Sequence, residues 1–202
     1  MKRLFMGLVA ALFMAPSLPL SAQAEEVFAT RAPRAPVLTM QWDEKKRAAA
    51  WTRATIKALE THGTALAQTV PADIDRWCPE YVNQDVAGRN AFWAGLLSSL
   101  SFYESTWRET VVGGGGKWYG LVQILPATAR GYGCEARSGS ALKNGELNLS
   151  CAVRIMAVTV PRDNVVSKGM RGVAADWGPF HSKKKREGMR RWVSQQNYCS
   201  KG

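Results

Sequence analysis

The chain has 202 residues and a formal net charge of +11, with 27 lysines and arginines against 16 aspartates and glutamates. Hydrophobic residues make up 46% of it, which is enough for a folded core and excludes an intrinsically disordered protein. The positive charge favours acidic partners: nucleic acid, anionic lipid or an anionic wall polymer.

Residues 1–24 have the features of a secretory signal peptide. Lys2 and Arg3 precede an apolar run over 4–15, and a small-x-small cleavage pattern ends at Ala24. The apolar run is shorter than the roughly 20 residues that a membrane-spanning helix needs, so we expect cleavage after Ala24 rather than a retained anchor. This predicts an exported protein without stable membrane insertion, and a periplasm fits it best.

The next segment, 25–42, is rich in Ala, Pro and Arg and predicts a flexible leader. An amphipathic helix is expected over 43–67, within an N-terminal segment, 43–70, that packs on the main domain at 71–202. Its expected inward positions are Trp51, Ile56, Leu59 and Leu66.

A strong helix is predicted over 89–106. Four residues of it follow one another at spacings of four, three and four, which places them on one helical face: Trp93, Leu97, Leu100 and Glu104. A carboxyl group that continues an apolar face is costly when charged, so its pKa rises, and a general acid needs such a pKa. The alternative is an ordinary exposed glutamate at a fraying helix end.

Four consecutive glycines, 113–116, cannot form a stable helix interior, so they predict a loop. The loop is either a plain connector or a backbone segment that comes close to a ligand. Short β segments are possible around 111–124. Pro126 is well placed to begin a short helix over 126–131.

Two further helices are expected, over 147–159 and about 185–197. Asn148 lies at the start of the first of these, where it can act either as a helix cap or as a substrate ligand. No convincing strand pairs occur. The sequence therefore predicts a mainly α domain with one glycine-rich excursion.

The four cysteines of an exported chain predict two disulfides. They are Cys78, Cys134, Cys151 and Cys199. Three connectivities are possible, and we favour Cys134–Cys151 with Cys78–Cys199. A metal site or a cysteine nucleophile is not supported, because the chain has only two histidines and no closely spaced cysteine pair.

A basic run, 181–186, continues with Arg190 and Arg191. It predicts a solvated loop and helix face, or else a surface that attracts an anionic polymer. Nucleic-acid binding is a rival interpretation, because such clusters contact phosphates, but export and disulfides argue against it.

Three motifs in order resemble family 1 lytic transglycosylases, the SLT domain with a lysozyme-like fold. They are Tyr-Glu-Ser-Thr-Trp at 103–107, Gly-Leu-Val-Gln at 120–123 and Leu-Asn-Leu at 147–149. The resemblance covers roughly 73–199 and implies a single α+β lysozyme-like domain with the glycine-rich loop beside its cleft. It is greatest to a disulfide-containing subgroup, which supports Cys134–Cys151.

The resemblance implies that Glu104 is a single acid/base, without metal or cofactor. It would cleave the β-1,4 bond between N-acetylmuramic acid and N-acetylglucosamine of peptidoglycan strands and leave a 1,6-anhydro sugar. The expected substrate-binding residues are Ser105, Tyr119, Gln123, Asn148 and Trp177.

One position departs from the family pattern, because Asp176 stands where a tyrosine is expected. Two alternatives therefore stay open: a hydrolase of peptidoglycan or chitin, and a non-catalytic wall-binding protein of the same fold. Asp176 and Glu109 are the candidates for a second carboxylate, although both fit ordinary surface residues. The residues do not select a partner among secretion, conjugation or flagellar assemblies.

Overall fold

The computed structural model describes residues 38–200, so the predicted signal peptide and most of the predicted leader lie outside the described residues. The described end of that leader is packed into the domain. Met40 and Trp42 are 2% and 0% exposed and belong to the core. The prediction of a flexible leader up to residue 42 is therefore corrected, because its last residues pack into the domain.

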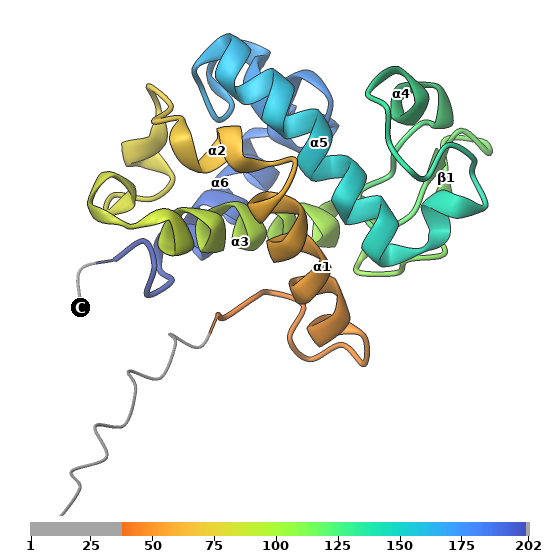
Figure 1. The fold of residues 1–202 in the computed structure, drawn as a ribbon, viewed down its shortest axis with the longest axis horizontal. Coiled ribbons are helices and arrows are strands. Elements are labelled where there is room, and N and C mark those ends of the chain that lie inside the picture. Colours follow the sequence, from red (N-terminus) through yellow and green to blue (C-terminus); the bar gives the residue numbers. More distant parts are fainter. Residues whose placement is uncertain (1–37, 201–202) are drawn as a thin grey trace, which may run out of the picture. The chain divides into compact units, whose positions relative to one another are not determined.

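The described chain is mainly helical, as the sequence predicts, and the short β segments that were possible around 111–124 pair as one small sheet (Figure 1). The α-helices are α1 (Ala48–Glu60), α2 (Thr64–Gln68), α3 (Val86–Ser105), α4 (Pro126–Gly131), α5 (Gly145–Asp163) and α6 (Lys183–Ser194). The strands are β1 (Val112–Gly113) and β2 (Trp118–Tyr119). Short 3₁₀ turns connect them: η1 (Ile74–Arg76), η2 (Tyr81–Asn83), η3 (Ala141–Lys143), η4 (Lys168–Met170), η5 (Gly172–Ala175) and η6 (Gly178–His181).

The predicted helix over 43–67 is two helices, because the chain breaks between α1 and α2. Gly63 lies in this break, and a Cβ there would clash with the side chain of Val153 on α5. The turn therefore lets α5 pack against both helices. Of the expected inward positions, Ile56 is only partly buried, whereas the other three are buried.

Helix α3 is the centre of the domain, and α1, α2 and α6 all pack against it (Figure 1). It begins earlier than predicted because the Asp85 carboxylate accepts a hydrogen bond from the Gly88 N–H at 2.8 Å and caps it. The buried positions of α3 form an unbroken run over 90–101. The prediction of one apolar stripe is therefore wrong in this respect: the helix is enclosed on nearly all sides.

Two other helix starts differ from the predictions. Asn144 caps α5 by accepting a hydrogen bond from the Leu147 N–H at 3.0 Å, so the predicted cap Asn148 lies inside the helix. Ser182 caps α6, which begins at Lys183 and ends at Ser194 rather than spanning 185–197. In both cases a capping side chain, rather than the apolar pattern, sets the first turn.

The glycine run forms the tip of the hairpin between β1 and β2. The strands pair antiparallel, with Val112 opposite Tyr119 and Gly113 opposite Trp118. Gly114 has a φ of 56°, and a Cβ there would clash with the ring of Trp118. This geometry makes the run a turn, and it agrees with the prediction of a loop.

Both predicted disulfides, Cys78–Cys199 and Cys134–Cys151, are confirmed. The first joins the region before α3 to the end of the described chain, and the second joins the segment after α4 to α5. Two such cross-links are typical of proteins from oxidising compartments. Over residues 38–200, no helix is long and apolar enough to cross a membrane.

Candidate active site

Glu104 lies in the last turn of α3 and is partly buried. Burial raises the pKa of its carboxyl group from 4.5 to about 7, and the nearby charge of Lys185 on α6 opposes that rise. Desolvation disfavours the charged form, so the group holds its proton close to neutrality. This property matches the sequence prediction for a general acid.

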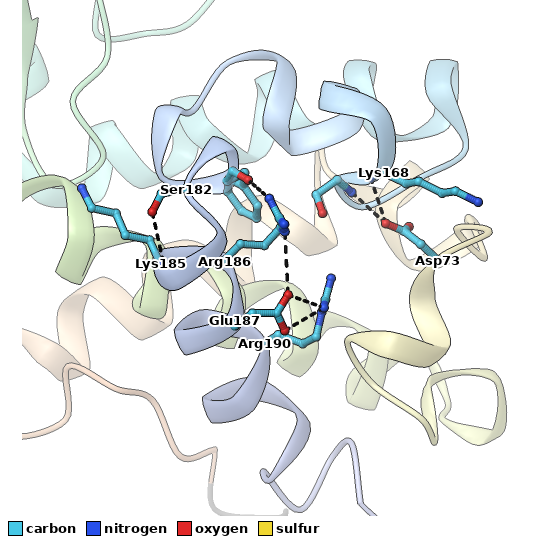
Figure 2. Close-up of polar contacts among 9 residues, drawn as sticks. Asp73, Lys168, Ser182, Lys185, Arg186, Glu187 and Arg190 are labelled. Carbon is cyan, nitrogen blue, oxygen red and sulfur yellow. Dashed lines mark hydrogen bonds and ion pairs between the residues drawn. The ribbon is translucent and has the colours of Figure 1, made fainter.

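The approach of α6 brings Lys185 near Glu104. Gly188 allows this approach, because a Cβ there would clash with the hydroxyl of Tyr103 on α3. In Figure 2, Lys185 extends from α6 toward a different side than Arg190 does. Helix α6 therefore presents Lys185 to the end of α3, whereas Arg190 lies on another side of the helix.

The turn over 120–123 requires glycine at its start. Gly120 has a φ of 83°, and a Cβ there would clash with the Leu142 carbonyl oxygen and the Asn148 amide. Gln123 closes the turn, because its Nε2 donates to the carbonyl oxygens of Gly120 at 2.9 Å and Val111 at 3.2 Å. The motif is thus a tightly held loop next to the hairpin.

Asn148 holds this turn from α5. Its Oδ1 accepts a hydrogen bond from the Val122 N–H at 3.0 Å, and its Nδ2 donates to the carbonyl oxygens of Tyr119 at 3.0 Å and Leu142 at 3.1 Å. The side chain is 0% exposed, and each of its polar atoms is paired. Asn148 therefore positions the loop, and the predictions of a cap or a direct substrate ligand are corrected.

Two more of the predicted substrate ligands have their polar atoms engaged within the protein. Ser105 is 3% exposed, and its hydroxyl donates to the Ser101 carbonyl oxygen and accepts from the Arg108 N–H, both at 3.2 Å. Trp177 is 3% exposed and donates its indole N–H to the Val122 carbonyl oxygen at 2.8 Å. These contacts give both residues positioning roles.

A small cavity of about 90 Å³ lies beside the turn. Gln123, Asp176, Trp177 and Trp118 line it together with apolar side chains and Thr128, whereas Glu104 is not among the lining residues. Trp118 is 44% exposed and was missed by the sequence reasoning, although a tryptophan next to the glycine run was a usable signal. An exposed ring beside an amide and a carboxyl group suits a sugar.

Tyr119 borders this region without entering the cavity lining. Its hydroxyl donates to the Gly116 carbonyl oxygen at 2.7 Å, and its ring fits against Gly139, where a Cβ would clash. The residue therefore braces the glycine tip of the hairpin.

The two candidate second carboxylates have different environments. Glu109 accepts hydrogen bonds from the Trp51 indole and the Gly145 N–H, both at 3.1 Å, and lies 3.4 Å from Arg47. It therefore anchors the start of α5. Asp176 remains exposed at the cavity, where desolvation by the surrounding protein raises the pKa of its carboxyl group.

The fold and site define a two-disulfide helical domain with a partly buried glutamate and a glycine-supported polar turn. No protein-family model matches the chain, and no curated protein matches it. Its fold is similar to solved structures of the Bdellovibrio protein DslA. Two glutamate-to-glutamine mutants of DslA are 28% and 27% identical, each with a TM-score of 0.73, over 80% of this chain and 97% of that one. A wild-type form is 25% identical with a TM-score of 0.69, over 80% and 98%.

Proposed function

We propose that the protein is a peptidoglycan lytic transglycosylase in which Glu104 is first the acid and then the base. The observation that carries this proposal is the partly buried carboxyl group at the end of α3, whose pKa is about 7. At neutral pH both protonation states of such a group are populated. One residue can therefore donate a proton in one step and accept one in the next.

The proposed reaction begins when Glu104 gives its proton to the glycosidic oxygen between N-acetylmuramic acid and N-acetylglucosamine. The bond from C1 to that oxygen breaks, and positive charge develops at C1. The C6 hydroxyl of the same muramic acid then attacks C1 and returns its proton to Glu104. A 1,6-anhydro end forms, and no water is consumed.

Glycosidases commonly use two carboxylates, one of which is the nucleophile or activates a water. Glu109 is one candidate for the second carboxylate, but its carboxylate already accepts hydrogen bonds from Trp51 and Gly145. This supports a mechanism with a single carboxyl group. Lys185 also supports this mechanism. Its positive charge opposes the rise in the pKa of Glu104, so the carboxylate form that acts as the base stays accessible.

The remaining features suit an exported wall enzyme. Without Lys2 and Arg3 of the predicted signal peptide, the chain has 25 basic and 16 acidic residues, a net charge of +9, and peptidoglycan bears acidic groups. Two disulfides fit a periplasmic location outside the reducing cytoplasm. Gln123 and the exposed ring of Trp118 line the cavity that we assign to a sugar of the glycan strand.

The test is digestion of purified sacculi, followed by mass analysis of the soluble muropeptides. We expect anhydro ends from the wild type and no release by Glu104→Gln, which should still sediment with sacculi. Glu60→Gln is the matched control, because Glu60 also lies in the last turn of a helix but is exposed. Release by Glu104→Gln at the wild-type rate would refute the role of Glu104.

A hydrolytic glycosidase is the second candidate, because Asp176 lies in the same cavity as Gln123 and can act as the base for a water. It predicts hydrated reducing ends, one water heavier than anhydro ends, and loss of cleavage in Asp176→Asn. A wild-type protein that binds sacculi but releases nothing would refute both enzymes and leave a wall-binding protein.

A further inference from the structure

A second cavity, of about 260 Å³, lies between the η4 loop and α6 and shares no lining residue with the cavity beside Gln123. In Figure 2, Asp73 and Lys168 lie on one side of it, and Arg186, Glu187 and Arg190 lie on the other. Four cationic side chains and two carboxylates line it: Arg76, Lys168, Arg186, Arg190, Asp73 and Glu187. We call it the basic cavity.

The Asp73 carboxylate is committed to the backbone of the loop. It is 6% exposed and accepts hydrogen bonds from the N–H groups of Val166 at 2.6 Å, Ser167 at 3.0 Å and Lys168 at 3.0 Å. These three bonds hold the wall of the basic cavity in place. The wall is therefore formed in advance of any ligand.

The Glu187 carboxylate is also committed. Both of its oxygens accept from Nη1 of Arg190, at 2.8 and 2.9 Å. Arg186 donates instead to the Phe180 carbonyl oxygen at 2.7 Å and lies 3.9 Å from Glu187. The lining thus has more cationic groups than carboxylates, with a formal charge of +2.

Several donors at the basic cavity have no partner within the described chain. The side chain of Arg190 is 14% exposed and lies over the ring of Trp77, and its buried Nε has no hydrogen bond. This Nε has almost no accessible surface, so the donors that a ligand in the cavity can reach are those of Arg76 and Lys168. Arg76 and Lys168 have no carboxylate partner among residues 38–200, which leaves their charges available.

The loop on the far side has an unusual backbone. Gly169 and Met170 have φ values of 71° and 60°, and Met170 is 54% exposed. A non-glycine residue in this conformation is strained and needs support from its surroundings. Asp73 holds the residues that directly precede this turn, so the wall is fixed on that side.

We propose that the basic cavity is a binding site for a compact dianion, namely a phosphate monoester group. A phosphate monoester carries about −1.5 to −2 charges near neutrality, which matches the formal charge of the lining. The planar guanidinium group of Arg76 suits phosphate oxygens, Lys168 adds a point charge, and Arg186 and Arg190 add positive charge to the lining. The site uses no group of the proposed active site, so it stands independently of the proposed function.

The test is calorimetric titration with inorganic phosphate, using the full mature chain. Arg76→Ala with Lys168→Ala should weaken binding about tenfold or more, because two charged donors are lost. Both side chains are exposed, so we expect no change in thermal stability. Lys183→Ala with Lys184→Ala is the matched control, because it removes the same charge from exposed positions outside the cavity.

Three outcomes would overturn the proposal. The first is no heat of binding with the wild type at millimolar phosphate, and the second is an equal loss in the two double variants, which indicates general attraction of anions. The third is equally tight binding of succinate, because a flexible dicarboxylate would then replace phosphate as the ligand class. Unchanged binding by Glu104→Gln is expected and separates this site from the proposed active site.

Discussion

The pKa of Glu104 predicts that Glu104→Gln stabilises the protein, and does so only at higher pH. The glutamine keeps the size of the side chain and removes its titration. In the folded protein the carboxyl group has a pKa of about 7, against 4.5 ordinarily, because burial disfavours its charge. The contribution of Glu104 to stability is therefore fully present below about pH 4.5 and is lost as the pH rises through about 7.

The size of this loss follows from the two pKa values. At 1.36 kcal/mol for each pKa unit, the interval corresponds to about 3 kcal/mol. The glutamine variant does not lose this stability, because its side chain does not become charged. Its free energy of unfolding should therefore differ from that of the wild type by about 3 kcal/mol more at high pH than at low pH.

Urea unfolding of both proteins near pH 4 and near pH 8 measures the effect. Glu60→Gln provides the control for the substitution itself, because Glu60 is exposed at the end of α1. A Glu104→Gln difference that is independent of pH would refute the reasoning. The residue would then titrate as an exposed carboxyl group, and the proposed acid would lose its basis.

Three further predictions follow from the contacts around the site. Lys185→Met should move the alkaline limb of the pH–rate profile to higher pH, because Lys185 lowers the pKa of Glu104, whereas Lys185→Arg should leave it in place. Asn148→Ala should cost about 2 to 4 kcal/mol in urea unfolding, since it removes the partners of the Val122 N–H and the Leu142 carbonyl oxygen and one of the two donors to the Tyr119 carbonyl oxygen; a cost below about 1 kcal/mol would contradict its positioning role. Gly120→Ala should lower the thermal midpoint by several degrees, because of its φ of 83° and the clash with the Leu142 carbonyl oxygen.

Helix α3 shows how much of the structure the local sequence pattern predicts. Spacing alone placed Glu104 at the end of an apolar helix, and the structure confirms a partly buried carboxyl group there. The same spacing predicted one inward stripe, whereas α3 is buried nearly all round. Apolar periodicity reports which face prefers the core, but the number of neighbours that enclose a helix depends on packing between distant segments.

The polar residues of the site show the complementary limit. Gln123 and Asn148 were expected in one cleft, and they do meet at the turn over 120–123, but Asn148 is wholly used in holding it. Ser105 is likewise turned inward. Residue type shows that a side chain can bind a sugar or a backbone group, and only its neighbours decide which of these it does.

By itself the sequence determined the mainly helical class, the glycine-rich loop, the short helix at Pro126 and the acid candidate Glu104, because propensity and periodicity act over a few residues. Only the tertiary structure decided the rest. It showed that Asn148 holds the turn over 120–123 and that Trp118 lines the cavity beside it. It also showed that residues around 73, 168 and 190 form one basic cavity. The physical reason is that burial, desolvation and hydrogen-bond pairing arise between segments far apart in the chain, which meet only when the chain folds.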